Sequence, residues 1–358
     1  MLAAFSMRIP SSPIALRFRL YQMKNIELSL IVPVFNGARY LREFVRSLDH
    51  QNVDALEIIM VDDGSTDRSA AMLDEIAAAD ARVVVLRQAN AGASVARNVA
   101  LRVARGRWIA FADCDDWLVP GALGAWLARA KTAQADVLVG NGFAFDDAPQ
   151  ARVPTSLFRR QPWGRTMSGW AWIRHAVSAG EWPHYVWLQL VRRDFLVRHR
   201  LSFEEGILHQ DIVWTVALAL TNGRFVFMRD LHYGYRRNPA SVTNDQSREA
   251  LWKRAQSYVR VLECIVGAAR QPDIDVSVRR ALMRQVNHES RHFHGLLRAK
   301  IKDSGLRNCL AQRFLSLGLH RAVLLGARWP QDFWHALRCT VALRHYVKGA
   351  VKIDPAPR

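Results

Sequence analysis

The arrangement of this chain can be worked out from one short segment, Trp108-Ile109-Ala110-Phe111-Ala112-Asp113-Cys114-Asp115-Asp116. Its apolar first half is typical of a buried strand, and three carboxylates follow directly. Carboxylates gathered at the end of a buried strand are unfavourable unless a proton or a cation compensates their charge. Since Mg²⁺ and Mn²⁺ bind carboxylates together with substrate phosphates, the segment predicts a metal–diphosphate site. The alternative is an acidic turn in which Asp116 caps a helix that begins near Pro120.

Upstream of this segment, strand patterns alternate with helix patterns. Apolar runs predict strands over 27–34, 57–61 and 83–86, and each run is followed by apolar residues at helical spacing. Such alternation predicts an α/β fold with a mostly parallel sheet flanked by helices. In a fold of this kind the ligand lies at the carboxyl ends of the strands.

A polar cluster follows each of the predicted strands. The clusters are Asn36, Asp62-Asp63, residues 90–94 and residues 113–116. Any one of them could be ordinary turn chemistry, but together they favour a nucleotide site at one edge of the sheet. The first strand is not followed by GxGxxG, and the chain has no GxxxxGK[ST] motif. The sequence therefore disfavours a dinucleotide oxidoreductase and a P-loop NTPase.

Composition adds two expectations. The chain carries 50 Lys and Arg against 32 Asp and Glu, a net charge of +18, which predicts attraction to phosphate-rich partners. Its four cysteines are scattered, without zinc-type spacing, as expected in a reducing compartment such as the cytoplasm. No apolar run in the sequence reaches the length of a membrane-spanning helix.

The positive charge is concentrated in a C-terminal region that looks helical. Residues 251–358 hold 20 Lys and Arg against 7 Asp and Glu, an excess of 13 positive charges. Apolar residues lie among these charges: Trp329, Phe333, Trp334, Leu337, Val341, Leu343 and Tyr346. The pattern suits an amphipathic surface on an anionic bilayer, the alternative being an ordinary solvated helix face. No recognised nucleic-acid motif accompanies the charge, so we expect no nucleic-acid partner.

In order and spacing, the motifs resemble those of the family 2 glycosyltransferases of GT-A fold. The matching segments are Val32-Pro33-Val34-Phe35-Asn36, residues 61–67, Asn90-Ala91-Gly92 with Ala96-Arg97-Asn98, and residues 113–116. The resemblance covers about residues 26–145 and continues more loosely through residues 190–211 to residues 235–243. It implies an inverting transfer of a sugar from a UDP- or dTDP-sugar to a hydroxyl of a bacterial surface glycan, with Mn²⁺ or Mg²⁺ as cofactor.

The resemblance also assigns residues to the donor site. Asp62 would accept a hydrogen bond from the uracil or thymine imide, and Asp113 and Asp115 would form the metal-binding Asp-X-Asp pair. Contacts with the nucleotide would come from Pro33, Phe35, Asn36, Asp62, Asn90, Arg97, Asp113, Arg236, Ser241 and Thr243. Among these, Arg97 would hold the diphosphate, where a guanidinium favours anions.

The base implied by the resemblance is Asp211. It would remove a proton from the acceptor hydroxyl, and one base without an enzymic nucleophile implies inversion. Many relatives have Glu where this chain has Gln210, so the supporting carboxylate is missing. The structural alternative for Asp211 is an N-cap of the following helix.

These expectations divide the chain into an N-terminal extension (1–24), a GT-A domain (25–248) and a helical basic region (249–358). Within the domain we expect a donor half at about 25–145 and an acceptor half at about 146–248. The tryptophan-rich segment 156–187 could be an acceptor platform or ordinary core. The composition and the resemblance together predict a cytoplasmic enzyme that is peripheral on the inner face of the cell membrane. The alternatives are a polyprenyl-phosphate sugar transferase and a non-catalytic glycan- or membrane-binding relative.

Overall fold

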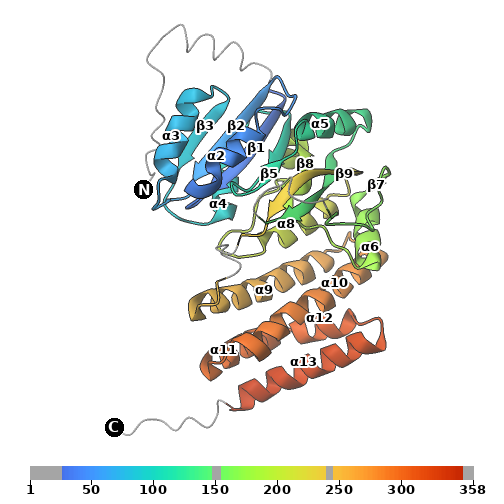
Figure 1. Cartoon of the computed structure of the whole chain (residues 1–358). Helices are drawn as coiled ribbons and strands as arrows, with labels where there is room; N and C mark the ends of the chain where they lie inside the picture. The colour runs from blue at the N-terminus through green and yellow to red at the C-terminus, as the bar shows by residue number, and fades with distance from the viewer. Residues whose placement is uncertain (1–25, 147–154, 239–244, 350–358) are drawn as a thin grey trace. The chain divides into compact units, whose positions relative to one another are not determined.

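The computed structural model describes residues 26–146, 155–238 and 245–349. These residues form two compact units. Unit 1 contains the described residues up to Gly169, together with Pro183–Gly206 and Leu220–Asn238. Unit 2 contains Trp170–Trp182, Ile207–Ala219 and the described residues that follow. Figure 1 labels most of the helices and strands of both units.

Unit 1 is built on a sheet of nine strands within the described residues. The strands are β1 (Leu28–Val34), β2 (Leu56–Asp62), β3 (Val83–Arg87), β4 (Trp108–Phe111), β5 (Trp117–Leu118), β6 (Val137–Phe145), β7 (Thr166–Ser168), β8 (Gln189–Arg192) and β9 (Arg224–Arg236). Their order is β3-β2-β1-β4-β8-β6-β9-β5, and β7 pairs with β9.

The first half of this sheet is parallel, as the alternating pattern predicts. β3, β2, β1 and β4 pair in parallel, with Val34 opposite Asp62 and Asp62 opposite Arg87. This register brings the carboxyl ends of these strands to one edge. Beyond β4 the pairing is mixed, because β8 runs antiparallel to both β4 and β6. The α/β fold with a helix-flanked sheet is therefore confirmed, and its parallel part is the β3-β2-β1-β4 half.

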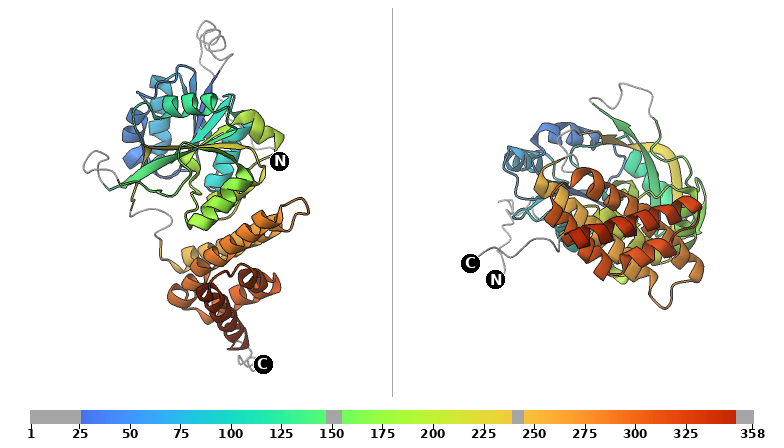
Figure 2. Two further views of the ribbon diagram at one scale, coloured as in Figure 1. Left: turned by 90° about the vertical axis from the view of Figure 1, so that its right-hand side faces the viewer. Right: turned by 90° about the horizontal axis from the view of Figure 1, so that it is seen from below.

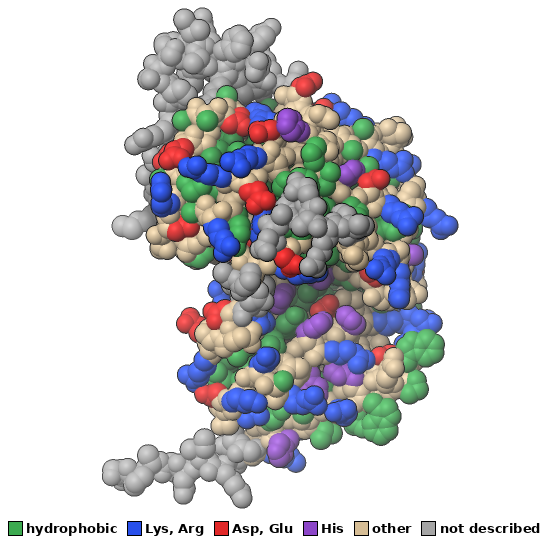
Figure 3. Space-filling model, in the orientation of Figure 1, with side chains coloured by type: hydrophobic (Ala, Val, Ile, Leu, Met, Phe, Trp, Pro, Cys, Tyr) green, Lys and Arg blue, Asp and Glu red, His purple; other side chains and the backbone are tan. Residues whose placement is uncertain are grey.

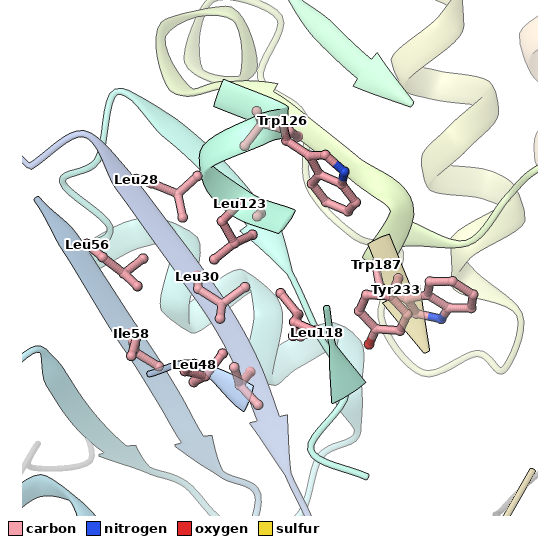
Figure 4. Packing of buried hydrophobic residues seen from close by; sticks show 14 of the residues in the cluster. Leu28, Leu30, Leu48, Leu56, Ile58, Leu118, Leu123, Trp126, Trp187 and Tyr233 are labelled. Atoms are coloured by element: carbon pink, nitrogen blue, oxygen red, sulfur yellow. The ribbon is translucent and has the colours of Figure 1, made fainter. Parts of the chain in front are cut away.

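Helices of unit 1 cover the sheet and complete its core. They are α2 (Ala38–Ser47), α3 (Ser69–Ala79), α4 (Ala93–Val103), α5 (Ala122–Thr132) and α7 (Arg193–Arg198), with the short 3₁₀ turn η2 (Val186–Leu188). Alternate residues of β1, such as Leu28 and Leu30, join one buried cluster with Leu123 and Trp126 of α5 (Figure 4). Burial of such side chains stabilises the fold by about 1.5–3 kcal/mol each. The core therefore fixes the strands, and the loops at their carboxyl ends are held on a rigid frame.

A buried carboxylate closes the opposite, amino-terminal edge of the parallel strands. Glu57 of β2 is 3% exposed and accepts hydrogen bonds from the Ser29 hydroxyl and from the Arg105 backbone and guanidinium. The Gly106 N–H donates to the Ser29 hydroxyl at 2.8 Å. These contacts tie β1, β2 and the turn before β4 together, and they satisfy the buried charge with hydrogen bonds and a guanidinium.

Unit 2 is helical in its described residues. Its elements are α6 (Gly169–Ala179), α8 (Gln210–Leu220), α9 (Arg248–Ala269), α10 (Val276–Gly295), the π-helical turn η4 (Leu296–Lys300), α11 (Ser304–Ser316), α12 (Leu319–Leu325) and α13 (Pro330–Gly349). α10 packs against α9 and α12, and α13 packs against α11 and α12 (Figure 2). The helical basic region expected from the sequence is thus observed. No helix in the described part of the chain is both long and apolar enough to cross a bilayer.

The tryptophan-rich segment is largely core. Trp172 and Trp182 are buried and stacked on each other in unit 2, with ring centroids 5.6 Å apart. Trp187 is buried in unit 1, where it stacks on Tyr233 at 4.4 Å. For these three residues the structure favours the core interpretation over an acceptor platform.

An apolar surface remains exposed on unit 2, and we call it the α12–α13 patch. Its members are between 49% and 76% exposed: Leu324, Leu325, Trp329, Phe333, Trp334, Leu337 and Val341. Figure 3 shows hydrophobic side chains gathered at one side of the C-terminal helices. Leu343, expected on this surface from its sequence, is fully buried on another face of α13 with Ala336 and Cys339.

Candidate active site

The loop after β1 is organised by Asn36. Its backbone lies in the left-handed region with φ of 51°, which asparagine tolerates better than most residues. The Asn36 Oδ1 accepts hydrogen bonds from the N–H groups of Thr66 and Asp67, at 2.8 and 3.3 Å. The side chain therefore joins the loops that follow β1 and β2. Its neighbour Phe35 is 43% exposed, an unusual degree for a large apolar side chain.

The two aspartates at the end of β2 have different tasks. Asp62 is 4% exposed, and its Oδ1 accepts from the Ser65 N–H at 3.0 Å. Asp63, also buried, accepts from the N–H groups of Ala91 and Gly92, each at 2.8 Å. Asp63 thereby orders the loop after β3, which carries the exposed Asn90.

A glycine allows these two loops to approach closely. Gly64 has φ of +72°, and a Cβ added to it would lie 2.7 Å from the Asn90 backbone nitrogen. Any other residue there would be strained and would push the loop away. The polar clusters that follow β1, β2 and β3 are therefore joined into one edge, as the sequence predicts.

The acidic segment after β4 lies at this same edge. The Asp113 carboxylate pairs with the guanidinium of Arg97, at 2.7 Å, and Arg97 is 4% exposed. Asp116 is buried and accepts from the Tyr233 hydroxyl and from the Arg236 N–H, both at 2.8 Å. The cap interpretation for Asp116 is wrong, because α5 begins at Ala122 and its N-cap residue is Gly121.

Crowding of carboxylates shows in their pKa values. Burial, and then the charge of Asp113, raises the pKa of Asp115. Burial, followed by the charges of Asp115 and Asp113, raises the pKa of Asp116 well above its usual range. A cation would relieve this repulsion. Because the donors are carboxylate oxygens, their chemistry fits Mg²⁺ or Mn²⁺, and the assignment of Asp113 and Asp115 as ligands stays a prediction.

Tyr233 of β9 supports this segment and was not anticipated from the sequence. Its hydroxyl donates to Asp116 and accepts from the Asp113 N–H at 3.1 Å. Burial raises the pKa of Tyr233 well above its usual range, so the hydroxyl keeps its proton. The local sequence offered no signal, because this contact depends on the pairing of β9 with β5 and β6.

Arg236 is more enclosed than the resemblance suggests. It is 6% exposed, pairs with Glu43 at 2.7 Å and donates to the Asp115 carbonyl at 2.7 Å. Its guanidinium also lies over the rings of Tyr40 and Phe145. Its role towards donor phosphates stays a prediction. The two other residues of the closing segment, Ser241 and Thr243, lie outside the described residues.

Asp211 belongs to unit 2. It is the second residue of α8, within the first turn, and its Oδ1 accepts from the Ile212 N–H at 3.1 Å. A carboxylate in this position is favoured by the helix dipole. The helix starts at Gln210, so Asp211 is not the N-cap residue. His209, with φ of 58°, contacts Tyr258 with ring centroids 4.6 Å apart and the two rings tilted by 31°.

Comparison with known proteins identifies the fold and the family. The family model "Glycosyl transferase family 2" matches residues 29–185. Residues 29–185 therefore form a family 2 glycosyltransferase domain. This glycosyltransferase is 29% identical over 316 residues to a protein of Escherichia coli (strain K12) named "Uncharacterized glycosyltransferase YibD", covering 87% of the chain and 90% of that protein.

Two further similarities are to a named glycosyltransferase and to a solved structure. Over 119 residues the chain is 36% identical to the poly(ribitol-phosphate) beta-glucosyltransferase of Bacillus spizizenii (strain ATCC 23059 / NRRL B-14472 / W23), covering 32% of the chain and 19% of that protein. The crystal structure of S. aureus TarS 1-349 in complex with UDP superposes with a TM-score of 0.65 at 19% identity, covering 92% and 93% of the two chains. This likeness supports the GT-A fold.

Proposed function

We propose that this glycosyltransferase moves a sugar from a UDP- or dTDP-sugar to a hydroxyl of a growing cell-surface glycan, with inversion at the anomeric carbon. The observation that carries the proposal is the buried Arg97 paired at 2.7 Å with Asp113, beside two carboxylates of raised pKa. A guanidinium next to a cluster that favours a divalent cation suits a diphosphate, whose oxygens bind both.

Donor recognition would use the edge formed by the loops after β1, β2 and β3. Phe35, exposed at the end of β1, offers an aromatic face to a nucleobase. The Asp62 Oδ1 accepts from Ser65, and Oδ2, which lies 4.0 Å from the Arg87 Nε, is the atom that would accept the imide hydrogen of uracil or thymine. Pro33 and Asn36 would border the base and ribose, and Asn90 would line the same edge.

Asp113 and Asp115 would hold Mn²⁺ or Mg²⁺, and the ion, when bound, would neutralise charge that develops on the leaving diphosphate. Arg97 would contribute a second positive charge to the same group. Asp115 is oriented by the Asn238 amide, which donates to its Oδ2 at 3.0 Å. We propose that Arg236, Ser241 and Thr243 complete the donor site.

Asp211 would act as the base. Its carboxylate would take the proton of the acceptor hydroxyl as that oxygen attacks the anomeric carbon, and a positioned base of this kind contributes about 10²–10⁴ in rate. With no enzymic nucleophile assigned, a single displacement inverts the configuration. The acceptor half, about residues 146–248, would supply the remaining acceptor contacts.

The surface-glycan assignment is supported by the named relatives, one of which acts on poly(ribitol-phosphate). We propose that the glycan is lipid-linked and that the α12–α13 patch binds the inner face of the cell membrane from the cytoplasm. Arg321, Arg328, Arg338, Arg344 and Lys348 belong to the same two helices or the turn between them. Apolar side chains among basic residues bind anionic bilayers through both burial and charge.

The catalytic proposal is tested by following nucleoside diphosphate release. The protein is incubated with Mn²⁺, a panel of UDP- and dTDP-sugars, and either detergent-extracted lipid-linked glycan or polyprenyl phosphate. We expect turnover with the glycan and a loss of about 10²–10⁴ in kcat for Asp211→Asn, with nucleotide binding retained. A matched control is Asp194→Asn, which changes an acidic residue in the first turn of α7.

Two results would count against this assignment. Turnover with polyprenyl phosphate alone would favour the alternative, a transferase that loads the lipid carrier. If Asp211→Asn and Asp194→Asn lowered kcat equally, Asp211 would not be the base.

Membrane binding is tested with sedimenting vesicles. We expect the chain to bind phosphatidylglycerol-containing vesicles and to dissociate from them when salt is added. The Leu325→Glu and Trp334→Ser variants should bind these vesicles more weakly than the wild type. The control is Val197→Glu, which changes a 66% exposed valine of α7 in unit 1. Binding that is equal in all variants would locate the contact outside the α12–α13 patch.

A further inference from the structure

A second set of metal-ligating side chains lies on α10, in unit 2. One ligand atom from each of His288, Glu289 and His292 lies within 4.8 Å of the others. The two histidines are four residues apart, so they share one helix face, and their ring centroids are 5.8 Å apart. Both are exposed, whereas Glu289 is 5% exposed. Figure 3 shows histidine side chains on the visible face of the C-terminal helices.

This donor set selects a different ion from that of the acidic site in unit 1. Two imidazole nitrogens and one carboxylate oxygen are a known ligand combination for Zn²⁺, and three protein ligands leave one position open. Asp113 and Asp115 offer oxygen atoms, which suit Mg²⁺ or Mn²⁺. The two groups of residues are therefore distinguishable by the metal that each prefers.

The spacing of the three ligands matches a known zinc-binding motif, but the glutamate has a different place in it. His288-Glu289-Ser290-Arg291-His292 has the H-E-x-x-H spacing in which two histidines of one helix bind zinc and the glutamate acts as a base. Here the Glu289 Oε1 lies 3.8 Å from the His288 Nδ1, within the ligand cluster. Glu289 is thus arranged as a third ligand.

Neighbouring contacts orient the ligands. The Gln285 amide donates to the Glu289 Oε1 at 2.7 Å, which fixes the carboxylate. Such supporting contacts raise metal affinity. Arg291 lies beside His292 in the sequence, but its guanidinium pairs with Asp332 at 2.7 Å, so its charge is compensated.

The cluster is connected to the start of α8 within unit 2. The His292 ring stacks on the Tyr258 ring with centroids 5.8 Å apart. The Tyr258 ring also contacts the His209 ring. Burial, and then the charges of Glu289 and Asp211, raises the pKa of Tyr258 to about 12. An ion on α10 would therefore restrain the residues next to Asp211.

We propose that His288, Glu289 and His292 form a Zn²⁺ site with one open coordination position, made of residues other than those of the donor site. The site does not depend on the proposed sugar transfer. Its bound ion stabilises the packing of α10 against Tyr258, which in turn contacts His209, and its open position accepts water or an anionic oxygen ligand.

The test uses the full chain, freed of metal by chelation. Zn²⁺ is titrated in competition with a chromophoric chelator, and Co²⁺ is added separately to record the visible absorption of the bound ion. We expect one tight equivalent of Zn²⁺ that excess Mg²⁺ does not displace. His288→Ala and His292→Ala should each weaken binding by more than about 100-fold, beyond the loss expected for a supporting contact.

Two controls separate this site from other binding. Asp115→Asn should leave Zn²⁺ affinity unchanged, so failure of the donor site and failure of this site are distinguishable. His345→Ala removes an exposed histidine of α13 and should have no effect. Circular dichroism checks that each variant is folded. Zn²⁺ binding that survives in the His288→Ala/His292→Ala double variant would overturn the proposal and would move the ion elsewhere, for example to the exposed Cys309 thiol.

Discussion

Buried carboxylates at the two ends of the parallel strands of unit 1 meet opposite surroundings. At the amino-terminal edge, Glu57 accepts hydrogen bonds from Ser29, Arg105 and the Arg105 backbone, and one guanidinium faces one carboxylate. At the carboxyl-terminal edge, Asp113, Asp115 and Asp116 lie together, with Arg97 paired to the first of them. After burial, the charge of Asp113 raises the pKa of Asp115, and the charges of Asp115 and Asp113 raise that of Asp116.

This difference separates a contact that holds the fold from one that serves chemistry. A buried charge that is fully compensated stabilises the strands and leaves nothing to bind a ligand. Carboxylates that repel one another are unfavourable in the protein alone and gain from a divalent cation. The comparison therefore predicts that changes at the first edge affect stability, whereas changes at the second affect ligand binding.

The largest expected effect concerns Glu57. Glu57→Ala leaves the Ser29 hydroxyl, the Arg105 N–H and the Arg105 guanidinium without their acceptor, which should lower the free energy of unfolding by about 3–5 kcal/mol. Urea unfolding of the purified variant measures it. Nucleotide binding well below the melting temperature should be retained, and Asp49→Ala, an exposed acidic residue, is the control. If Glu57→Ala left the stability unchanged but abolished nucleotide binding, the amino-terminal edge would serve ligand binding and not the fold, contrary to this prediction.

A smaller effect is expected for Tyr233, which supports the acidic edge. Tyr233→Phe removes the hydroxyl that donates to Asp116 and accepts from the Asp113 N–H, so it should cost about 1–3 kcal/mol. Because Asp113 loses a restraint, Mn²⁺-dependent nucleotide binding should weaken as well, as calorimetry would measure. Tyr235→Phe, which changes a half-buried tyrosine of the same strand, should alter both quantities less. Equal effects of the two variants would argue that the hydroxyl of Tyr233 does not matter.

The smallest effect is a gain. The folded pKa of Asp115 is raised above its ordinary value of 3.8, so the metal-free folded protein binds this proton more tightly than the unfolded chain does. The associated stability is fully present below that ordinary value and is lost as the pH rises through the folded pKa. Asp115→Asn should therefore stabilise the metal-free protein at pH 7.

Urea unfolding across a pH series, with chelator present, measures this gain. The wild type should lose stability with rising pH in that window, and the variant should show a shallower slope. A variant that is less stable than the wild type at every pH would show that Asp115 is not strained by its neighbours.

The sequence predicts the parallel half of the sheet closely. The run predicted at 57–61 is β2, Leu56–Asp62, and the polar clusters after β1 to β4 do meet at one edge. Local patterns suffice here, because strand and loop residues differ in polarity. The sequence does not reveal Tyr233 or Glu43 as partners of the acidic edge, since their contacts arise from elements far apart along the chain.

The same limit applies to α13. Leu343 and Val341 are both apolar and both fit the helical period, yet Leu343 is buried and Val341 is 58% exposed. Periodicity shows that a helix has apolar faces, but only packing against other helices decides which face is covered. The sequence therefore predicts that an apolar surface exists on these helices, but only the structure shows which residues form the α12–α13 patch.

We propose that the acidic edge holds a metal and a nucleoside diphosphate. The most direct measurement is the melting temperature of the full chain with UDP or dTDP, with and without Mn²⁺, for the wild type and Asp115→Asn. Ligand at 100 times its Kd should stabilise the folded protein by about 2.7 kcal/mol, a rise of a few degrees. We predict a Mn²⁺-dependent rise with UDP or dTDP that Asp115→Asn abolishes while remaining folded. No rise with any nucleotide, or an equal rise in Asp115→Asn, would contradict the account.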